Sequence, residues 1–206
     1  AGSFLPYLPS DTVVWHVSQD HSIPVIPNFL GVVITGAQQL VSMTDPWVQT
    51  LLSFLSEMVA EEILVLGFVL DTNFDEGLGA EVGFLSIPEV GWKTVSRIEQ
   101  SPLWAGILAE VDVFLSHRDA VLSRGFVTLL GASAECGVQA FQHKGDLFGG
   151  IQFHPEMTVE ECARLLVYRR ERHPELVLDW GEEHEKLRFN APLAQKFFDN
   201  FLDFIG

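Results

Sequence analysis

The chain has 206 residues, of which 48% are hydrophobic, and this is enough to bury the core of one domain over residues 1–206. Asp and Glu number 28 against 12 Lys and Arg, so the formal net charge is −16. A chain this acidic repels phosphate backbones and anionic lipid, so we expect neither a nucleic-acid partner nor a membrane partner. No apolar run reaches the roughly 18–20 residues of a membrane span, and the first residues lack the cationic region of a secretory signal. The two cysteines, Cys136 and Cys162, are expected to be reduced thiols in a cytoplasmic protein.

The first part of the chain predicts a parallel α/β unit. Short β-rich runs predict strands at 12–17 and 29–35. Residues 46–62 place apolar side chains on one face at helical spacing, and the pair Thr44–Asp45 ahead of them offers an N-cap. The apolar run Ile63–Phe68 suits a central strand that is covered on both faces. A strand, a helix and a strand in this order form the βαβ unit of an α/β sheet.

The second part predicts antiparallel strands followed by helices. Five short strand-like runs separated by Gly and polar pairs are found at 91–99, 111–117, 126–133, 137–143 and 147–153. Thr158 and Glu161 form a capping-box pattern ahead of a helix. Residues 171–190 are highly charged and indicate a solvated helix or loop, and residues 191–205 form a final amphipathic helix whose aromatic face is expected to be core.

Residues 67–73 have the pattern of a tight turn between a buried strand and a helix. Such turns often carry a nucleophile in the pattern G-x-(Ser or Cys)-x-G. Here Val69 stands at the tip, and Asp71 stands where the second glycine would be. Valine has no ionisable atom and no lone pair, so it cannot attack a substrate.

Two other segments place polar side chains near predicted strand ends. His154-Pro155-Glu156 follows one strand, and the pair has the character of a base with its orienting carboxylate. Ser116–Asp119 lies at the end of another strand. Strand ends on one edge of an open α/β sheet form a site crevice, so we expect these segments to lie near the turn at Val69.

These segments together resemble the class I glutamine amidotransferases, and more narrowly the glutaminase part of GMP synthase. The resemblance runs from about Phe29 to Met157. It rests on GVVITGAQQ, PWVQTLLSFL, LVLGFVLDTNFDEGLGAEVG, GWKTV, SPLWAGI, VFLSHRD, ECGVQAF and, most specifically, GGIQFHPEM. It implies a three-layer α/β fold of the flavodoxin-like type, in which helices flank a mostly parallel sheet with an antiparallel extension. The family opens with a strand for which only GSFLPYLPSD is available here, so we expect that first strand to be absent.

The resemblance also implies roles for single residues. His154 matches the base, Glu156 matches the acid that orients it, and Val69 occupies the position of the cysteine nucleophile. The implied oxyanion turn and substrate pocket comprise Gly36, Ala37, Leu70, Asn73, His117 and Asp119. Several positions in and beside this pocket depart from the family: Ala37 replaces a glycine, Asn73 replaces a glutamine and Asp71 replaces a glycine. The departures cluster around one pocket, which favours a lineage that has lost glutamine hydrolysis.

Structural interpretations stand beside these functional ones. His154 and Glu156 could persist as a hydrogen-bonded pair that fixes a loop, and His117 and Asp119 could belong to a solvated loop. Cys136 lies away from the turn and is a poor candidate for a substitute nucleophile. The histidines at 173 and 184 match no metal-site spacing, so no metal and no cofactor are expected.

The sequence leaves the question of enzymatic activity open. The first hypothesis is a catalytically silent binding or interaction protein. Its expected ligand is a small-molecule amide or an amino acid, and it would act with a protein partner. The second is a glutamine amidotransferase, hydrolysing glutamine to glutamate and ammonia, seen as an inactive variant. The third is a hydrolase or transferase with repurposed chemistry around His154, Glu156, His117 and Asp71.

Overall fold

The computed structural model describes residues 2–20, 23, 30–36, 44–68, 82–121, 127–143, 148–174 and 191–205. The helices within these ranges are η1 (Leu5–Tyr7), α1 (Val17–Asp20), α2 (Pro46–Ala60), η2 (Pro102–Trp104), α4 (Val159–Arg172) and α5 (Ala191–Ile205). The strands are β1 (Gly31–Thr35), β2 (Leu64–Phe68), β3 (Val82–Arg97), β4 (Glu110–Val121), β5 (Val127–Ala132), β6 (Ala140–His143) and β7 (Phe148–Ile151). None of the helices in these ranges is long and apolar enough to cross a membrane.

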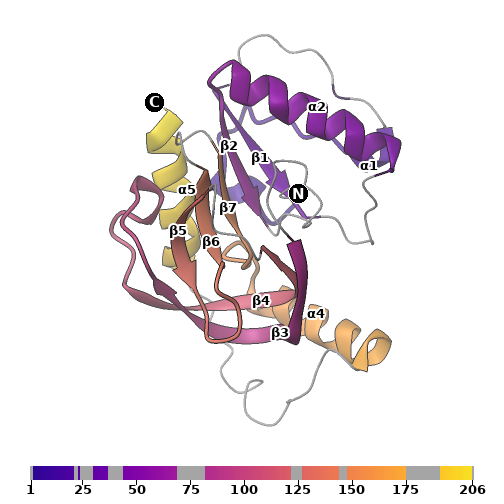
Figure 1. Cartoon of the computed structure of the whole chain (residues 1–206), viewed down its shortest axis with the longest axis vertical. Coiled ribbons are helices and arrows are strands. Elements are labelled where there is room, and N and C mark those ends of the chain that lie inside the picture. The colour runs from indigo at the N-terminus through magenta and orange to yellow at the C-terminus, as the bar shows by residue number, and fades with distance from the viewer. Residues whose placement is uncertain are drawn as a thin grey trace.

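The described strands form a single mixed sheet of seven strands in the order β1-β2-β7-β6-β5-β3-β4 (Figure 1). The pairs β1–β2 and β2–β7 are parallel. The pairs β7–β6, β6–β5, β5–β3 and β3–β4 are antiparallel. The predicted α/β class with a parallel part and an antiparallel extension is therefore confirmed, and the extension takes up a large share of the sheet. A single domain over residues 1–206 stays a prediction.

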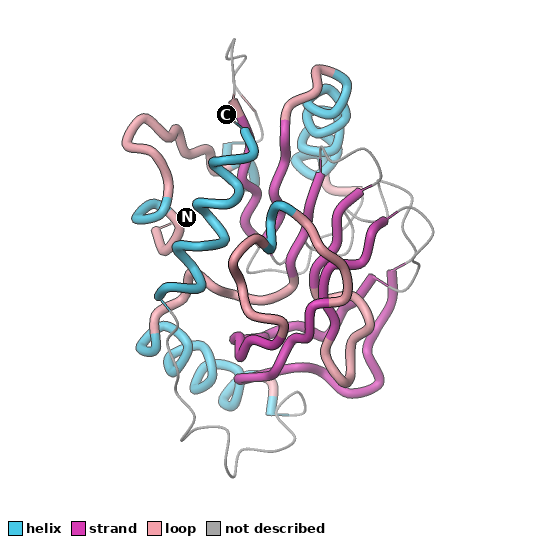
Figure 2. The backbone as a smooth tube through the Cα atoms, turned by 90° about the vertical axis from the view of Figure 1, so that its left-hand side faces the viewer, coloured by secondary structure: helices cyan, strands magenta, loops and turns pink. Residues whose placement is uncertain are grey.

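Helices cover both faces of the parallel part, as Figures 1 and 2 show from two directions. Successive side chains of β2 point to opposite faces, because a strand has a side-chain period of two. Leu64, Leu66 and Phe68 pack in the core cluster that contains α5. Val65 packs in the cluster that contains α2. The continuous apolar run of β2 is thus explained by a strand that is buried on both faces.

Aromatic side chains hold the N-terminal segment and α5 against β2. Phe198 of α5 stacks on Phe68 with ring centroids 5.1 Å apart, and on Tyr7 with centroids 5.0 Å apart. Phe4 meets Phe68 edge-on at 4.9 Å. Aromatic pairs at these separations add to the free energy gained by burying their area. The aromatic face of the last helix is therefore core, as predicted.

Helix α4 begins as the sequence indicates and packs on the antiparallel part. The Thr158 hydroxyl accepts a hydrogen bond from the backbone N–H of Glu161, and the Glu161 carboxylate accepts one from the backbone N–H of Thr158. Cys162 and Leu166 on its buried face join a small cluster with residues of β3 and β4. The capping box fixes where the chain turns into the helix, only a few residues after the His154–Glu156 pair.

Two strand predictions need correction. The strand predicted at 12–17 is wrong, because residues 12–16 are irregular and Val17 begins α1. Val13 and Val14 are exposed, so their β-propensity is not supported by a strand partner or a buried face. The strand predicted at 91–99 begins earlier, at Val82, because it pairs along most of its length with β4. Ahead of β1, the described residues form only η1 and α1.

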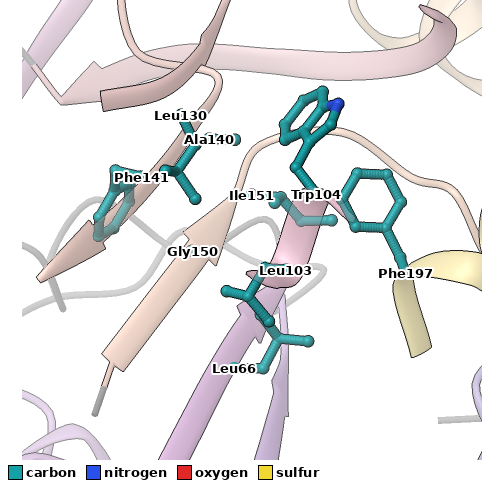
Figure 3. Close-up of a pocket in the computed structure, with 9 residues that line it drawn as sticks. All are labelled: Leu66, Leu103, Trp104, Leu130, Ala140, Phe141, Gly150, Ile151 and Phe197. Atoms are coloured by element: carbon teal, nitrogen blue, oxygen red, sulfur yellow. The ribbon is translucent and has the colours of Figure 1, made fainter. Parts of the chain in front are cut away.

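A small apolar cavity lies inside the core, where η2, α5 and the strands β2, β5, β6 and β7 meet (Figure 3). It is lined by Leu66, Leu103, Trp104, Leu130, Ala140, Phe141, Gly150, Ile151 and Phe197. No ionisable side chain is among these residues. Since binding of a polar ligand requires hydrogen-bonding groups, this cavity is a packing feature and not a candidate site.

Candidate functional site

The ends of three parallel strands define one edge of the sheet. In the register of the sheet, Thr35 of β1 lies beside Phe68 of β2, and Phe68 lies beside Ile151 of β7. The three strands therefore end at the same edge of the sheet, where α/β folds place their ligands. Gly36 is described and exposed. Val69, Leu70, Asn73 and Ala37 lie outside the described residues.

His154 and Glu156 form a hydrogen-bonded pair just beyond β7. The His154 Nδ1 atom lies 2.9 Å from the Glu156 Oε1 atom. The His154 side chain is 18% exposed, whereas that of Glu156 is 3% exposed. The backbone N–H of His154 donates to the carbonyl of Phe114 at 2.8 Å, which anchors the histidine to β4. The carboxylate is thus buried behind an imidazole that solvent can reach.

This arrangement is compatible with the base and orienting acid that the family resemblance implies. A carboxylate accepts hydrogen bonds, so the pair requires the imidazole proton on Nδ1 and leaves the lone pair of Nε2 free to take a proton. The other carboxylate oxygen of Glu156 and the side-chain nitrogen of Gln152 are buried, and neither has a hydrogen-bond partner among the described residues. Buried polar atoms without partners near a strand-end edge are candidates for ligand contacts.

His117 and Asp119 lie within β4 and not in a loop. His117 is buried, and its Nδ1 atom lies 3.0 Å from the backbone carbonyl oxygen of Asp119. Arg118 places its Nε atom 3.6 Å from the carboxylate of Asp119, and its guanidinium lies over the Phe84 ring. An isolated bridge joins Leu115 to Phe153, so β4 connects the segment at 116–119 with the strand end that carries His154.

Sequence reasoning missed the partners of His117. Glu89 of β3 is completely buried, and its carboxylate Oε2 lies 3.3 Å from the His117 Nε2 atom. Ser133 and Gln139 also hydrogen-bond to this carboxylate. A charged residue inside the otherwise apolar run SIPEVGW was the available signal, but its partner appears only once the strand register places Glu89 opposite His117.

The remaining candidates give no sign of separate chemistry. No group of three His, Cys, Asp or Glu side chains that could hold a metal ion occurs in the part of the chain that the structure describes. Burial, together with the nearby charge of Glu89, raises the pKa of the Cys136 thiol to about 11. A thiol with such a pKa is a poor nucleophile at neutral pH, which argues against Cys136 as a substitute nucleophile.

Sequence comparisons place the chain among known proteins. The family description "Glutamine amidotransferase class-I" matches residues 74–169. A glutamine-hydrolyzing GMP synthase subunit from Methanococcus maripaludis strain C6 is 26% identical over 164 residues, which cover 78% of this chain and 78% of that protein. The glutamine-hydrolyzing GMP synthase of Streptococcus mutans is 32% identical over 146 residues, which cover 68% of this chain and 27% of that longer protein.

Solved structures support the fold. A glutamine amidotransferase from Thermotoga maritima superposes with a TM-score of 0.69 at 18% identity, covering 84% of this chain and 77% of that one. A glutamine amido transferase from Methylobacillus flagellatus superposes with a TM-score of 0.68 at 21% identity, covering 90% and 82%. At these identities the likeness concerns the fold alone, and the seven-stranded mixed sheet flanked by helices is the fold that these proteins share.

Proposed function

The chain belongs to the class I glutamine amidotransferase family, and from this premise we propose that it binds a small amide or amino acid without hydrolysing glutamine. The observation that carries the proposal is the combination of an intact His154–Glu156 pair with a hydrocarbon side chain at position 69. The base and its orienting acid remain, while the atom that would attack is missing.

The cost of that loss is large. Removing the nucleophile of a catalytic triad typically lowers kcat by about 10⁶-fold, and what remains comes from the oxyanion hole and from binding. The family resemblance assigns an oxyanion turn to this chain, and the residues of that turn also differ from those of the family, at Ala37 and near Leu70. We propose that a pocket without these two features still binds a ligand but cannot form a thioester with it.

A protein partner is part of this proposal. The Methanococcus relative is named as a subunit of a glutamine-hydrolyzing GMP synthase, which supports a second protein as the partner of this chain. We propose that this chain likewise acts together with a second protein. The partner would either respond to the ligand-bound form of the chain or receive the ligand from it. We also keep the cytoplasm as the expected compartment.

The intact pair favours a second candidate, an active glutamine amidotransferase of which this sequence is an inactivated variant. His154 and Glu156 have the hydrogen-bonded geometry that a working base requires. In a lineage that lost catalysis long ago, selection for activity would no longer preserve this pair. This candidate predicts that restoring one side chain restores chemistry.

A first experiment measures glutamate and ammonia after incubation with glutamine. We expect no release above that of buffer. Turnover that disappears in His154→Ala would contradict the proposal and would establish hydrolysis by a route that does not use a cysteine at position 69.

A second experiment restores the nucleophile with Val69→Cys. We expect a glutamine-analogue electrophile to attach covalently to this variant, and intact-mass measurement would detect one added group. Val69→Ala serves as the matched control and should remain unlabelled, and Val69→Cys combined with His154→Ala should be labelled more slowly. Absence of labelling in Val69→Cys would show that the glutamine pocket itself is lost. Glutamine turnover by Val69→Cys would favour the second candidate.

A further inference from the structure

A second group of buried polar side chains lies in the antiparallel part of the sheet, separate from the His154–Glu156 pair. Glu89 on β3 and His117 on β4 stand directly opposite each other in the strand register. The pairing of the two strands shifts between Phe84 and Glu89, so an irregularity in β3 sets the alignment that brings these two side chains together. Glu89 is fully buried, and the side chain of His117 is 5% exposed.

The carboxylate of Glu89 faces three hydrogen-bond donors. The Ser133 hydroxyl donates to Oε1 at 2.6 Å, and the Gln139 side-chain amide donates to Oε2. The His117 Nε2 atom lies 3.3 Å from Oε2. Burial alone would raise the pKa of the Glu89 carboxyl, but the hydrogen bonds from His117 and Ser133 outweigh it and hold this pKa below its ordinary value. Glu89 is therefore a buried anion.

The imidazole of His117 lies between two acceptors. Its Nδ1 atom faces the backbone carbonyl oxygen of Asp119 at 3.0 Å, and its Nε2 atom faces the Glu89 carboxylate. A carbonyl and an ionised carboxylate can only accept hydrogen bonds, so both ring nitrogens need a proton. The Gln139 amide nitrogen lies farther from Nε2, at 3.4 Å, and already donates to Glu89 and Ser133.

The order of these groups excludes a second catalytic triad. In a triad the histidine lies between the hydroxyl and the carboxylate, and takes the proton of the hydroxyl. Here the carboxylate lies between the Ser133 hydroxyl and the His117 ring. The Ser133 hydroxyl donates its proton to Glu89, so Ser133 is not activated as a nucleophile. The role left for the cluster is to position neighbouring groups.

We propose that Glu89 is a positioning residue that holds His117 as a buried imidazolium cation. This cation fixes the backbone carbonyl of Asp119 and thereby shapes the 116–119 segment. The inference rests on the proposed function, together with the family resemblance, which implies that His117 and Asp119 line the substrate pocket. The cluster also reaches the other wall of the site, because the carbonyl of Gln139 accepts the backbone N–H of Gln152, two residues before His154.

The charge state of His117 is tested in the intact protein by nitrogen-15 NMR of its ring. We expect both ring nitrogens of the unmodified protein to be protonated at pH about 7, where a free histidine is mostly neutral. Glu89→Gln should convert the ring to a neutral form with one bare nitrogen, whereas the matched control Glu99→Gln, at an exposed carboxylate, should leave it charged. A neutral ring in the unmodified protein would overturn the proposal, whether or not Glu89→Gln folds.

The effect on the pocket is tested in the Val69→Cys background. Adding Glu89→Gln should lower the labelling rate with the glutamine-analogue electrophile by about 10- to 100-fold, the size of effect expected when a hydrogen bond to a charged group is lost. Labelling with iodoacetamide should keep its rate, because this reagent needs no pocket. A purely structural defect would instead lower the labelling rates of both reagents. Equal loss in both reactions, or no loss in either, would contradict the positioning role. If Val69→Cys alone is not labelled, the proposed function fails, and the NMR measurement still decides the charge of His117.

Discussion

At the level of single residues, burial decides what the two cysteines can do. Cys136 and Cys162 are both almost fully buried, and burial is the largest cause that raises their pKa values, to about 11 and about 12. Nearby carboxylates add to it, Glu89 for Cys136, and Glu156 and Glu161 for Cys162. Because only the thiolate reacts, we expect the native protein to resist iodoacetamide at neutral pH.

Both thiols should become reactive together once urea unfolds the chain, which mass spectrometry of alkylated peptides would measure. The same shifts have a consequence for stability. In the folded state these thiols keep their protons above their ordinary pKa of 9.0, so from about pH 9 upward the folded chain binds more protons than the unfolded one. The free energy of unfolding must then fall as the pH rises, and Cys162→Ala should reduce this alkaline loss. Rapid labelling of either thiol in the native protein would contradict the argument.

The residue scale also shows which part of the site a sequence can reveal. His154 and Glu156 are two positions apart, so their pairing could be inferred from the chain alone. Glu89 and His117 meet only because β3 and β4 pair in one particular register. That register depends on an irregularity in β3 that no local sequence pattern predicts. The buried cluster was therefore beyond sequence reasoning, although it involves a histidine that the sequence had singled out.

At the scale of elements, patterns with many consistent side chains were predicted well. The helix α2, the buried strand β2, the capping box of α4 and the aromatic face of α5 each combine periodicity with an end signal or with continuous burial. The run at 12–17 had β-propensity alone and forms no strand. Propensity describes side chains that fit a sheet, but a strand also needs a neighbour to pair with, which is a property of the whole fold.

The end of α2 gives a prediction about backbone strain. The backbone N–H of Ile63 donates to the carbonyl of Met58, which closes the helix, and Glu62 between them has a positive φ of 59°. Glycine is the residue that adopts this conformation without cost, and other residues lose roughly 1–2 kcal/mol. We expect Glu62→Gly to raise the free energy of unfolding by about 1 kcal/mol, measured by urea denaturation.

The matched control for this change is Glu57→Gly, in the body of the same helix. It removes the same side chain and the same charge, but places glycine where the backbone is helical. There it should lower stability by about 1 kcal/mol, since glycine is disfavoured in helix interiors. Opposite signs for the two variants would identify strain at position 62 as the cause, and equal signs would refute it.

At the scale of the whole molecule, the net charge of −16 sets the balance between the folded and unfolded states. Among the described residues, the ion pairs involving carboxylates include His117–Glu89, Arg118–Asp119 and His154–Glu156. The 12 Lys and Arg side chains are too few to neutralise the 28 Asp and Glu side chains, and a compact state brings the excess like charges together. Salt screens this repulsion over distances beyond about 10 Å at 0.1 M.

We therefore expect sodium chloride to stabilise the protein against heat. If screening removes about 1 kcal/mol of repulsion, Tm should rise by about 2–4 °C for a chain of this size. A variant with Glu99→Gln and Glu110→Gln, which neutralises two exposed acids, should melt higher at low salt and gain less from added salt. Thermal melts followed by circular dichroism across a salt series would measure both effects. A Tm that is independent of salt in both proteins would mean that the acidic groups lie too far apart to repel one another. The excess negative charge would then not lower the free energy of unfolding.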